Sequence, residues 1–288
     1  MIPYLILAAT ALTATVQNIF KQKFNERCKG SAYFFAAMTS FCAMLFFIAV
    51  SRDPYYSAEL LLPSAAFAIS YATSTVFSVL AIFHGPLAKT SLILSCSLLI
   101  PSFYGIIVLH DPVSPTLLPG IAVLVAALVC VNHRKKIDGE DKKITLKWLL
   151  FVALSFIGNG MCSTVQKAKQ QVYGNEGNNM FMIAALAMVV VMLVCAAFCF
   201  KNQRAVIKTT VKRGWWLALL CGAANGLTNY VVIYLNPRIP ASVLFPVVSG
   251  GGLVLIFLWS VLVKREKFTP IQYAGYALGV VSIVLLNL

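Results

Sequence analysis

Residues 110–132 read HDPVSPTLLPGIAVLVAALVCVN, and residues 265–287 read REKFTPIQYAGYALGVVSIVLLN, on the same plan. Each stretch has an acidic residue at its second position, Asp111 or Glu266, continues with a hydroxyl residue next to a proline, and is largely apolar from there to a final asparagine. A Ser or Thr directly before a first-turn proline is typical of a helix N-terminus. The two stretches therefore predict two similar apolar helices, far apart in the chain.

The rest of the chain is as apolar as these two stretches. Of its 288 residues, 60% are hydrophobic and only 11% are charged, whereas a soluble domain is about a quarter charged. A helix of about 17–25 apolar residues crosses a bilayer core of about 30 Å. We therefore predict an all-α integral membrane protein with ten transmembrane helices, at 3–20, 32–50, 62–83, 87–109, 115–131, 148–166, 178–200, 214–234, 240–263 and 270–287.

The net charge of +14 is explained by topology. With ten helices, 19 of the 23 Lys and Arg residues fall on connections that face one side of the membrane. The positive-inside rule places that side in the cytoplasm, so both termini are expected outside. The first segment lacks a basic start and a cleavage site, which favours a helix over a removable signal peptide. We expect a multi-pass protein of the cytoplasmic membrane that binds no nucleic acid.

The chain contains an internal repeat. Thr15-Val16-Gln17 recurs as Thr164-Val165-Gln166, and Gly85-Pro86 corresponds to Asn236-Pro237. The domains expected are a first half at 1–134, a charged linker at 135–147 and a second half at 148–288. Because each half has five helices, an odd number, the second half must be inverted in the membrane. Inverted repeats around a midplane site are common in secondary transporters.

Polar side chains recur at steps of three and four in four of the expected helices, so each set shares one helix face. The interpretation as a central polar cavity competes with simple interhelical hydrogen bonding, which stabilises packing by about 0.6 kcal/mol per bond. Matched stripes in repeat-related helices favour the cavity. The candidate solute-binding residues are Asn159, Asn225, Asn229, Gln17, Gln166, Tyr71, Ser74, Thr13 and Ser95.

The segment 240–263 carries helix-weakening residues inside its apolar run, in the stretch FPVVSGGGLVLIF. Proline and small residues permit a bend, a close approach of backbones or an open space. Pro246 and Gly250, Gly251 and Gly252 are therefore candidates for a hinge or a cavity wall. The repeat places the serines of 87–109 opposite them.

Ionisable residues inside the bilayer are the first functional candidates in a membrane protein, and none of the nine Asp and Glu residues falls in the middle of an expected helix. Lys89 and His84 lie at the turn before 87–109, where Lys89 either reaches the interface or contacts an anionic solute.

The three histidines stand near helix ends, and the eight cysteines include no CxxC pair. We therefore expect no enzyme, no cofactor and no metal site. Gly275 and Gly279 form a GxxxG motif, which occurs within monomers and at dimer contacts alike, so a monomer and a homodimer both stay open.

The sequence resembles a known family in the stretches HDPVSPTLLPG, REKFTPIQYAG, GPLAKTSLILSCSLLIPSFYG and PVVSGGGLVLIFLWSVLVKREK. They look like the ten-helix EamA-like branch of the drug/metabolite transporter superfamily. The resemblance implies two inverted five-helix repeats around a central cavity, with the last helix of each half at the periphery. It also implies transport of small metabolites, often outward. Asp111 departs from the glutamate common there, and the membrane-embedded glutamate of the four-helix relatives is missing.

We therefore expect a secondary transporter that moves a small polar or zwitterionic metabolite by alternating access, as an exporter. The alternative is an exporter of hydrophobic drugs or lipid-linked intermediates, which predicts a lateral opening lined by Phe and Leu. A non-transporting scaffold is a third possibility, and solute-dependent stabilisation would argue against it. The partners expected are the solute and the lipid bilayer.

Overall fold

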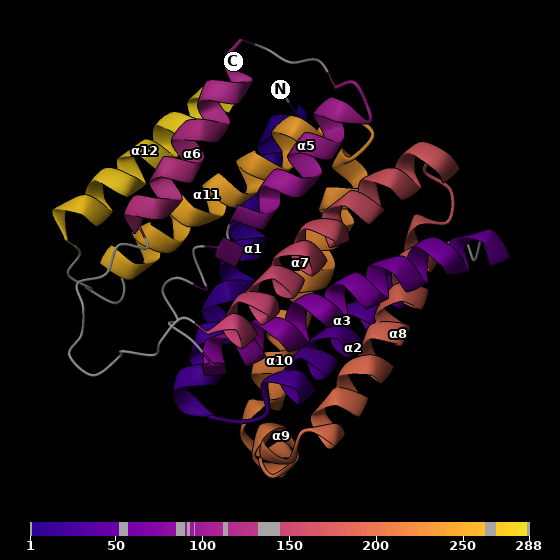
Figure 1. Ribbon diagram of the computed structural model, residues 1–288. Helices are drawn as coiled ribbons and strands as arrows, with labels where there is room; N and C mark the ends of the chain where they lie inside the picture. Colours follow the sequence, from indigo (N-terminus) through magenta and orange to yellow (C-terminus); the bar gives the residue numbers. More distant parts are fainter. Residues whose placement is uncertain are drawn as a thin grey trace.

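The computed structural model describes residues 2–51, 57–84, 90, 93–94, 96–111, 115–131, 145–262 and 269–286. Over this part of the chain the protein is all-helical, with no strand (Figure 1). The helices of the N-terminal half are α1 (Ile2–Arg27), α2 (Ala32–Val50), η1 (Ala58–Leu60), α3 (Leu61–His84), η2 (Cys96–Leu98), α5 (Leu99–Ile107) and α6 (Leu117–Val131). Those of the C-terminal half are α7 (Leu146–Tyr173), α8 (Asn178–Cys199), α9 (Lys201–Arg204), α10 (Ile207–Leu235), α11 (Ala241–Leu262) and α12 (Pro270–Leu286).

Five helical stretches in the described part are long and apolar enough to cross a membrane. Such lengths are compatible with a multi-pass membrane protein. The stretches are Ala32–Val50, Ala58–Ala81, Leu146–Tyr173, Asn178–Cys199 and Ile207–Leu235.

Several helices extend beyond the apolar runs that predicted them. α7 continues to Tyr173 through the sequence KAKQQVY, and α1 continues to Arg27. Lys, Gln and Ala are good helix formers, so these polar ends stay helical where the hydrophobic pattern stops. The helices are therefore longer than the apolar segments alone indicate.

The segment 87–109 is not one continuous α-helix in the described residues. It contains the short 3₁₀ helix η2, and α5 starts only at Leu99 and ends at Ile107. Pro101 lies in the first turn of α5, where its missing N–H breaks no intrahelical hydrogen bond. The proline therefore favours a new helix start inside an apolar run.

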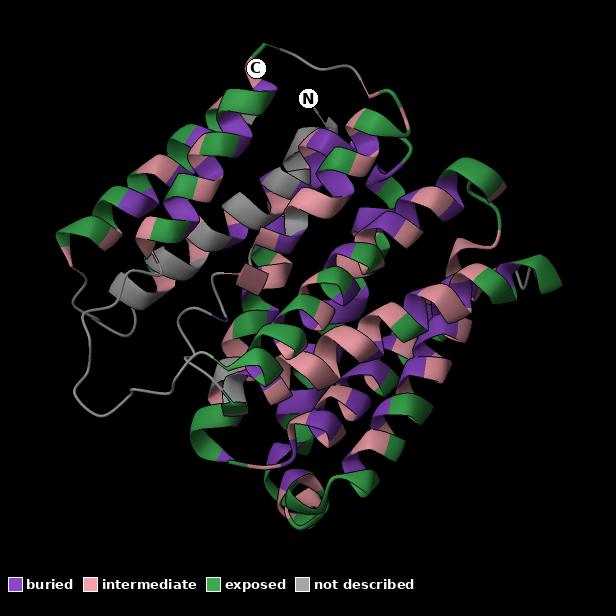
Figure 2. Ribbon diagram, in the orientation of Figure 1, coloured by how far each residue is buried: buried purple, intermediate pink, exposed green. Residues whose placement is uncertain are grey.

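The helices pack in a defined order. α3 lies along α7, α10 lies between α1 and α2, and α2 also contacts α8. α6 and α12 pack side by side at one edge and join the other helices mainly through α11 (Figure 1). Buried residues follow the inward faces, and exposed residues follow the outward faces (Figure 2).

Glycines permit close backbone contact at three of these interfaces. A Cβ at Gly158 of α7 would lie 2.8 Å from the backbone N of Ser74 in α3, and one at Gly222 of α10 would lie 2.7 Å from the carbonyl O of Thr39 in α2. Gly275 of α12 is pressed against the α6 backbone in the same way. The GxxxG glycine Gly275 thus serves a contact inside one chain.

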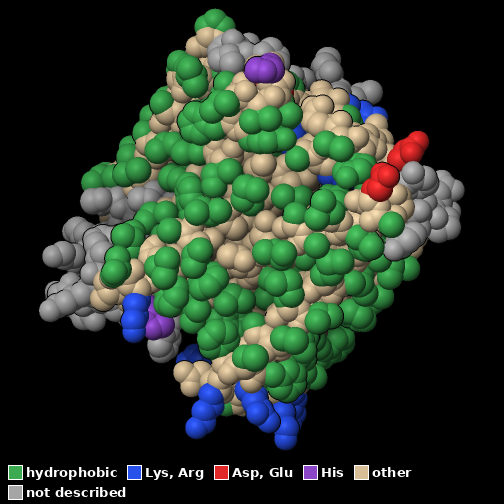
Figure 3. All heavy atoms as spheres, turned by 45° about the vertical axis from the view of Figure 1, so that its right-hand side comes forward, with side chains coloured by type: hydrophobic (Ala, Val, Ile, Leu, Met, Phe, Trp, Pro, Cys, Tyr) green, Lys and Arg blue, Asp and Glu red, His purple; other side chains and the backbone are tan. Residues whose placement is uncertain are grey.

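The surface divides into an apolar side wall and a basic end. Figure 3 shows Lys and Arg gathered at the end of the molecule where α9 lies, below a wall that is largely hydrophobic. Large apolar side chains such as Leu62, Ile69 and Val191 are exposed on this wall. Extended exposed apolar surface of this kind is typical of a membrane contact.

Candidate functional site

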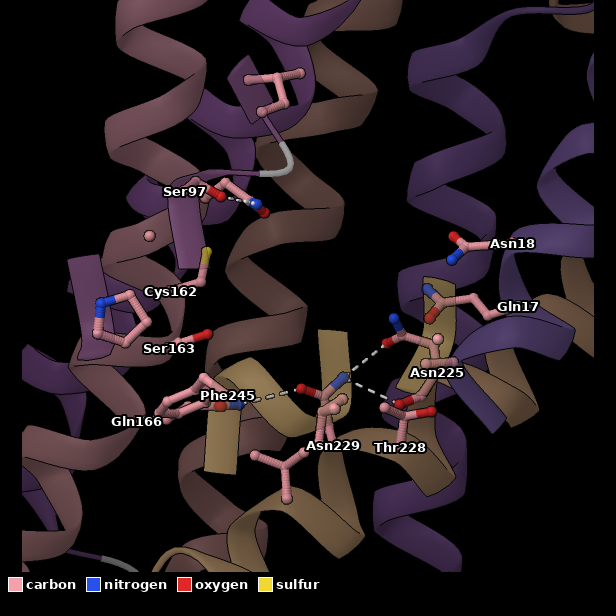
Figure 4. A pocket seen from close by; sticks show the side chains of 18 of the residues that line it. Gln17, Asn18, Ser97, Cys162, Ser163, Gln166, Asn225, Thr228, Asn229 and Phe245 are labelled. Carbon is pink, nitrogen blue, oxygen red and sulfur yellow. Dashed lines mark hydrogen bonds between the residues drawn. The ribbon is translucent and has the colours of Figure 1, made fainter. Parts of the chain in front are cut away.

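A cavity of about 540 Å³ lies between the helices. Its walls come from α1, α3, α5 with η2, α6, α7, α10, α11 and α12, so both halves of the chain contribute (Figure 4). Apolar walls include Phe67, Leu124 and Phe245. The polar or polarisable lining residues are Gln17, Asn18, Tyr71, Ser97, Asn159, Cys162, Ser163, Gln166, Asn225, Thr228, Asn229 and Tyr276.

Three amide side chains form a chain of hydrogen bonds across the cavity wall from α7 to α10 (Figure 4). Gln166 Nε2 donates to Asn229 Oδ1 at 3.1 Å. Asn229 Nδ2 donates to the backbone O of Asn225 at 3.0 Å and to Asn225 Oδ1 at 3.1 Å. Asn225 and Asn229 are one helical turn apart, so they share a face of α10. We call these three residues the amide chain.

Asn159 forms a second polar point, on the α7 face nearest η2. Its Nδ2 donates to Ser97 Oγ at 2.6 Å, and the side chain is otherwise exposed to the cavity. Because one amide can donate twice and accept twice, Asn159 retains hydrogen-bonding capacity for a solute.

The opposite wall is supplied by α1. Gln17 and Asn18 line the cavity there. Thr13 lies behind the wall, where its Oγ1 accepts from Thr228 Oγ1 at 2.8 Å. This bond joins α1 to α10 next to the amide chain, so Thr13 supports the site through Thr228.

The structure brings together six of the nine residues predicted to bind solute. They are Gln17, Tyr71, Asn159, Gln166, Asn225 and Asn229. Ser74 is not a lining residue: its backbone O accepts from Ser155 Oγ at 2.9 Å, at the contact between α3 and α7. Ser95 lies outside the described residues.

Of the positions predicted as a cavity wall or a charged contact, some line the cavity and others do not. Gly252 lines the cavity, whereas Gly251 faces Ala11 of α1, where an added Cβ would lie 2.9 Å from the alanine Cβ. His84 is exposed at the end of α3, with Nδ1 2.9 Å from the backbone O of Leu80. Lys89 and the side-chain environments of Pro246 and Gly250 lie outside the described residues.

A polar cluster that the sequence did not predict lies beyond one end of the cavity, at the turn between α10 and α11. Lys167, only 4% exposed, donates from Nζ to the backbone O of Asn236 (2.5 Å) and of Ile239 (3.1 Å). These carbonyls follow the C-terminus of α10, where the helix dipole favours a cation. Lys167 lies one residue beyond the expected helix 148–166, although it directly follows Gln166 on α7.

Asp111 ties a further segment to the same turn. Its Oδ2 accepts from the backbone N of Ser242 at 3.2 Å and lies 3.4 Å from Ser242 Oγ. An acidic group at these first N–H groups caps the N-terminus of α11. We call Lys167, Asp111 and the α10–α11 turn they hold the polar latch.

The described lining of the cavity combines amides and hydroxyls with apolar walls. No Asp, Glu, Lys, Arg or His is among the residues that line it in the described part of the chain. Within the same residues, no group of three His, Cys, Asp or Glu is placed to hold a metal ion. The site is suited to hydrogen bonding of a solute without net charge.

Comparison with known proteins bears on the fold. One crystal structure of another protein matches 98% of this chain and 95% of its own, with a TM-score of 0.77 and 14% sequence identity. At this identity the likeness concerns the fold alone. No protein-family profile and no curated protein matches the chain.

Proposed function

We propose that the chain is a secondary transporter of the cytoplasmic membrane, with ten crossings arranged as two inverted five-helix halves. The helix contacts support this arrangement. If each helix is exchanged with its repeat partner (α1 with α7, α2 with α8, α3 with α10, α5 with α11, α6 with α12), the contact of α3 with α7 becomes that of α10 with α1. The contact of α2 with α10 likewise becomes that of α8 with α3, and both members of each pair occur. Self-exchanging pairs, α2 with α8 and α6 with α12, also occur.

The orientation follows from the charges. The basic end around α9 faces the cytoplasm in this proposal, by the positive-inside rule. The N and C marks both lie toward the end of the molecule opposite α9 (Figure 1), which agrees with termini on the outside. The resemblance of the sequence to EamA-like drug/metabolite transporters fits the same topology.

The cargo of this transporter is a small polar or zwitterionic metabolite, and the direction is export. The single observation that carries the cargo class is the amide-lined cavity between the two halves, which has no charged residue in its described lining. The export direction rests on the resemblance to EamA-like transporters. A midplane site between repeats is where secondary transporters bind their solutes. Amides both donate and accept, so they hold polar groups without requiring a net charge on the solute.

Alternating access is supported by the unequal ends of the cavity. The lining reaches Val131, the last residue of α6, and Tyr276 near the start of α12. α6 ends directly before the basic sequence 132–147, and α12 begins directly after the basic sequence 264–269. At the other end the polar latch holds α7 against the α10–α11 turn. Export then requires the latch bonds to break after a solute has bound from the cytoplasm.

The test is transport by purified protein in liposomes, after a thermal-shift screen of uncharged and zwitterionic metabolites has supplied a solute. Asn159→Leu and Asn225→Leu should lower the initial rate at least tenfold, because each removes hydrogen bonds to the solute. Asn202→Leu, the same change on the exposed helix α9, is the matched control. Parent-like transport by both cavity variants would refute the site.

The rival cargo, a hydrophobic drug or lipid-linked intermediate, has one observation in its favour. An apolar groove of about 440 Å³ lies on the side wall between α3 and α8, and its lining residues are all Ala, Ile, Met or Val. None of them lines the amide cavity. Transport that survives Asn225→Leu but is lost on filling the groove with Ala65→Trp would favour this rival.

A further inference from the structure

We propose that the amide chain binds its solute in one orientation, with a hydrogen-bond acceptor of the solute at Asn225 and a donor at Gln166. The inference rests on the proposed function, since it concerns the cargo of the same cavity. It specifies which end of a two-ended solute meets α10 and which end meets α7.

The orientation starts from one backbone carbonyl. The side chain of Asn229 lies 3.0 Å from the backbone O of Asn225. A carbonyl oxygen can only accept a hydrogen bond, so the atom of Asn229 that faces it must be the amide nitrogen. The side-chain oxygen of Asn229 must then point the other way, toward Gln166.

This orientation of the Asn229 amide also fixes the orientations of the Gln166 and Asn225 amides. The oxygen of Asn229 accepts, so Gln166 must present its Nε2, whose other near contact is Met182 Sδ at 3.8 Å. The nitrogen of Asn229 uses its second hydrogen on Asn225 Oδ1 at 3.1 Å. Neither Gln166 nor Asn225 can rotate its amide by half a turn without losing its bond to Asn229.

Each end of the amide chain keeps one polar side-chain atom that the amide chain itself does not use. This atom is a donor at one end and an acceptor at the other. Asn225 keeps Nδ2, a donor, and Gln166 keeps Oε1, an acceptor; neither atom forms a hydrogen bond with the described part of the protein. Both residues line the cavity, yet their side chains are only 7% and 5% exposed. A site with buried polar atoms of this kind rejects a solute that cannot pair with them.

The Asn225 end and the Gln166 end of the amide chain also have different neighbours. Figure 4 shows the Asn225 amide beside Gln17 and Asn18, whose amides can both donate to a solute and accept from it. Phe67 and Met182 belong to the apolar cluster against which Tyr71 packs, and Gln166 contacts that cluster through Met182. The rings of Phe67 and Tyr71 line the same cavity, and aromatic faces in a binding site favour an ammonium group. The cargo class is therefore a small solute with a carboxylate or carbonyl at one end and an amine or N–H at the other.

Three short probes test the two ends separately: 4-aminobutyrate, butyrate without the donor and butylamine without the acceptor. Binding to the detergent-solubilised full chain is measured by thermal shift over a concentration series. We expect 4-aminobutyrate to bind at least tenfold more tightly than either one-ended probe, because each missing hydrogen bond to a charged group weakens binding by about tenfold or more. A parent protein that binds all three alike, or none of them, overturns the inference.

The orientation is tested by Asn225→Asp, which keeps the acceptor for Asn229 and replaces the unused donor with an acceptor oxygen. The variant should lose at least tenfold in affinity for 4-aminobutyrate and gain for 1,4-diaminobutane. Unchanged or tighter 4-aminobutyrate binding would reverse the proposed orientation and so refute it. Asn202→Asp on α9 carries the same charge change outside the cavity and serves as the control.

A second variant keeps the proposal testable if Asn225→Asp does not fold. Gln166→Met removes the acceptor at the other end and should weaken 4-aminobutyrate and butylamine while leaving the weak butyrate binding unchanged. Equal loss for butyrate would contradict the assignment of the donor end to Gln166. Failure of the transporter itself is read separately, from the Asn159→Leu assay on the screened solute.

Discussion

Asn18 in α1 and Lys167 in α7 follow the same Thr-Val-Gln motif, yet they have opposite surroundings. Asn18 is exposed and lines the cavity, whereas Lys167 is buried with its ammonium group on two backbone carbonyls. The local sequence is matched, so the difference comes from what each helix end meets in the bundle. In the proposed transport cycle, the end of the cavity near Asn18 is the open one and the end near Lys167 is the closed one.

Lys167→Met should break this difference most strongly. Loss of the ammonium leaves the buried carbonyls of Asn236 and Ile239 without their donor, and hydrogen bonds to charged groups contribute about 1.5–3 kcal/mol each. We expect the free energy of unfolding to fall by about 3 kcal/mol, measured as a lower Tm in detergent. Lys201→Met on exposed α9 is the control; an equal Tm for both variants would mean that the latch contributes nothing.

Asn18→Lys makes the open end resemble the closed one. The new ammonium group enters a cavity that has no charged lining residue in the described part, and it meets no carbonyl cage there. We expect uptake from the basic side to fall at least tenfold, about 1.4 kcal/mol in the barrier, with little change in Tm. The measurement is the initial rate in liposomes of defined orientation, and a parent-like rate would show that Asn18 is not on the path.

Asp111→Ala removes the second part of the latch. The first N–H groups of α11 lose their acidic cap, which costs about 1 kcal/mol at a helix N-terminus. We expect a smaller fall in Tm than for Lys167→Met. Asp111→Asn should recover part of the loss, because its side-chain oxygen still accepts from Ser242; no recovery would place the effect in charge alone.

Thr13→Val tests the open end with the mildest change. It removes the hydroxyl that accepts from Thr228, and interhelical bonds of this kind contribute about 0.6 kcal/mol in a membrane protein. A small fall in Tm is expected, well below that of either latch variant. A larger fall than Asp111→Ala would indicate that the α1–α10 contact, and not the latch, dominates the stability of the cavity.

Much of the cavity could be predicted because its residues repeat with the period of a helix. Asn159 and Gln166, seven positions apart, share one face of any helix, and Asn225 and Asn229 share another. Ser74 shows the limit of that reasoning: it belongs to the same stripe as Tyr71, yet α7 approaches α3 so closely at Gly158 that Ser74 meets backbone in place of the cavity.

The latch could not be predicted from periodicity. Lys167 begins a polar end that the hydrophobic pattern assigns to a connection, and its partner Asn236 is 69 residues away in sequence. The break at η2 had a local signal in Pro101, but an apolar run of this length alone indicates one helix. The long-range partners of Lys167 and the start of a new helix inside an apolar run could therefore be found only from the three-dimensional structure.

The orientations of the three amides depend on one backbone carbonyl, that of Asn225, and this dependence limits how the site can evolve. A substitution at Asn229 alters which atoms Asn225 and Gln166 present, so the effect of any one change depends on the other two. A single substitution at Asn229 leaves the amides of Asn225 and Gln166 mismatched, so a change at this central position requires a matching replacement at one of its two partners. Libraries that vary these three positions together should yield altered selectivity far more often than libraries that vary them one at a time.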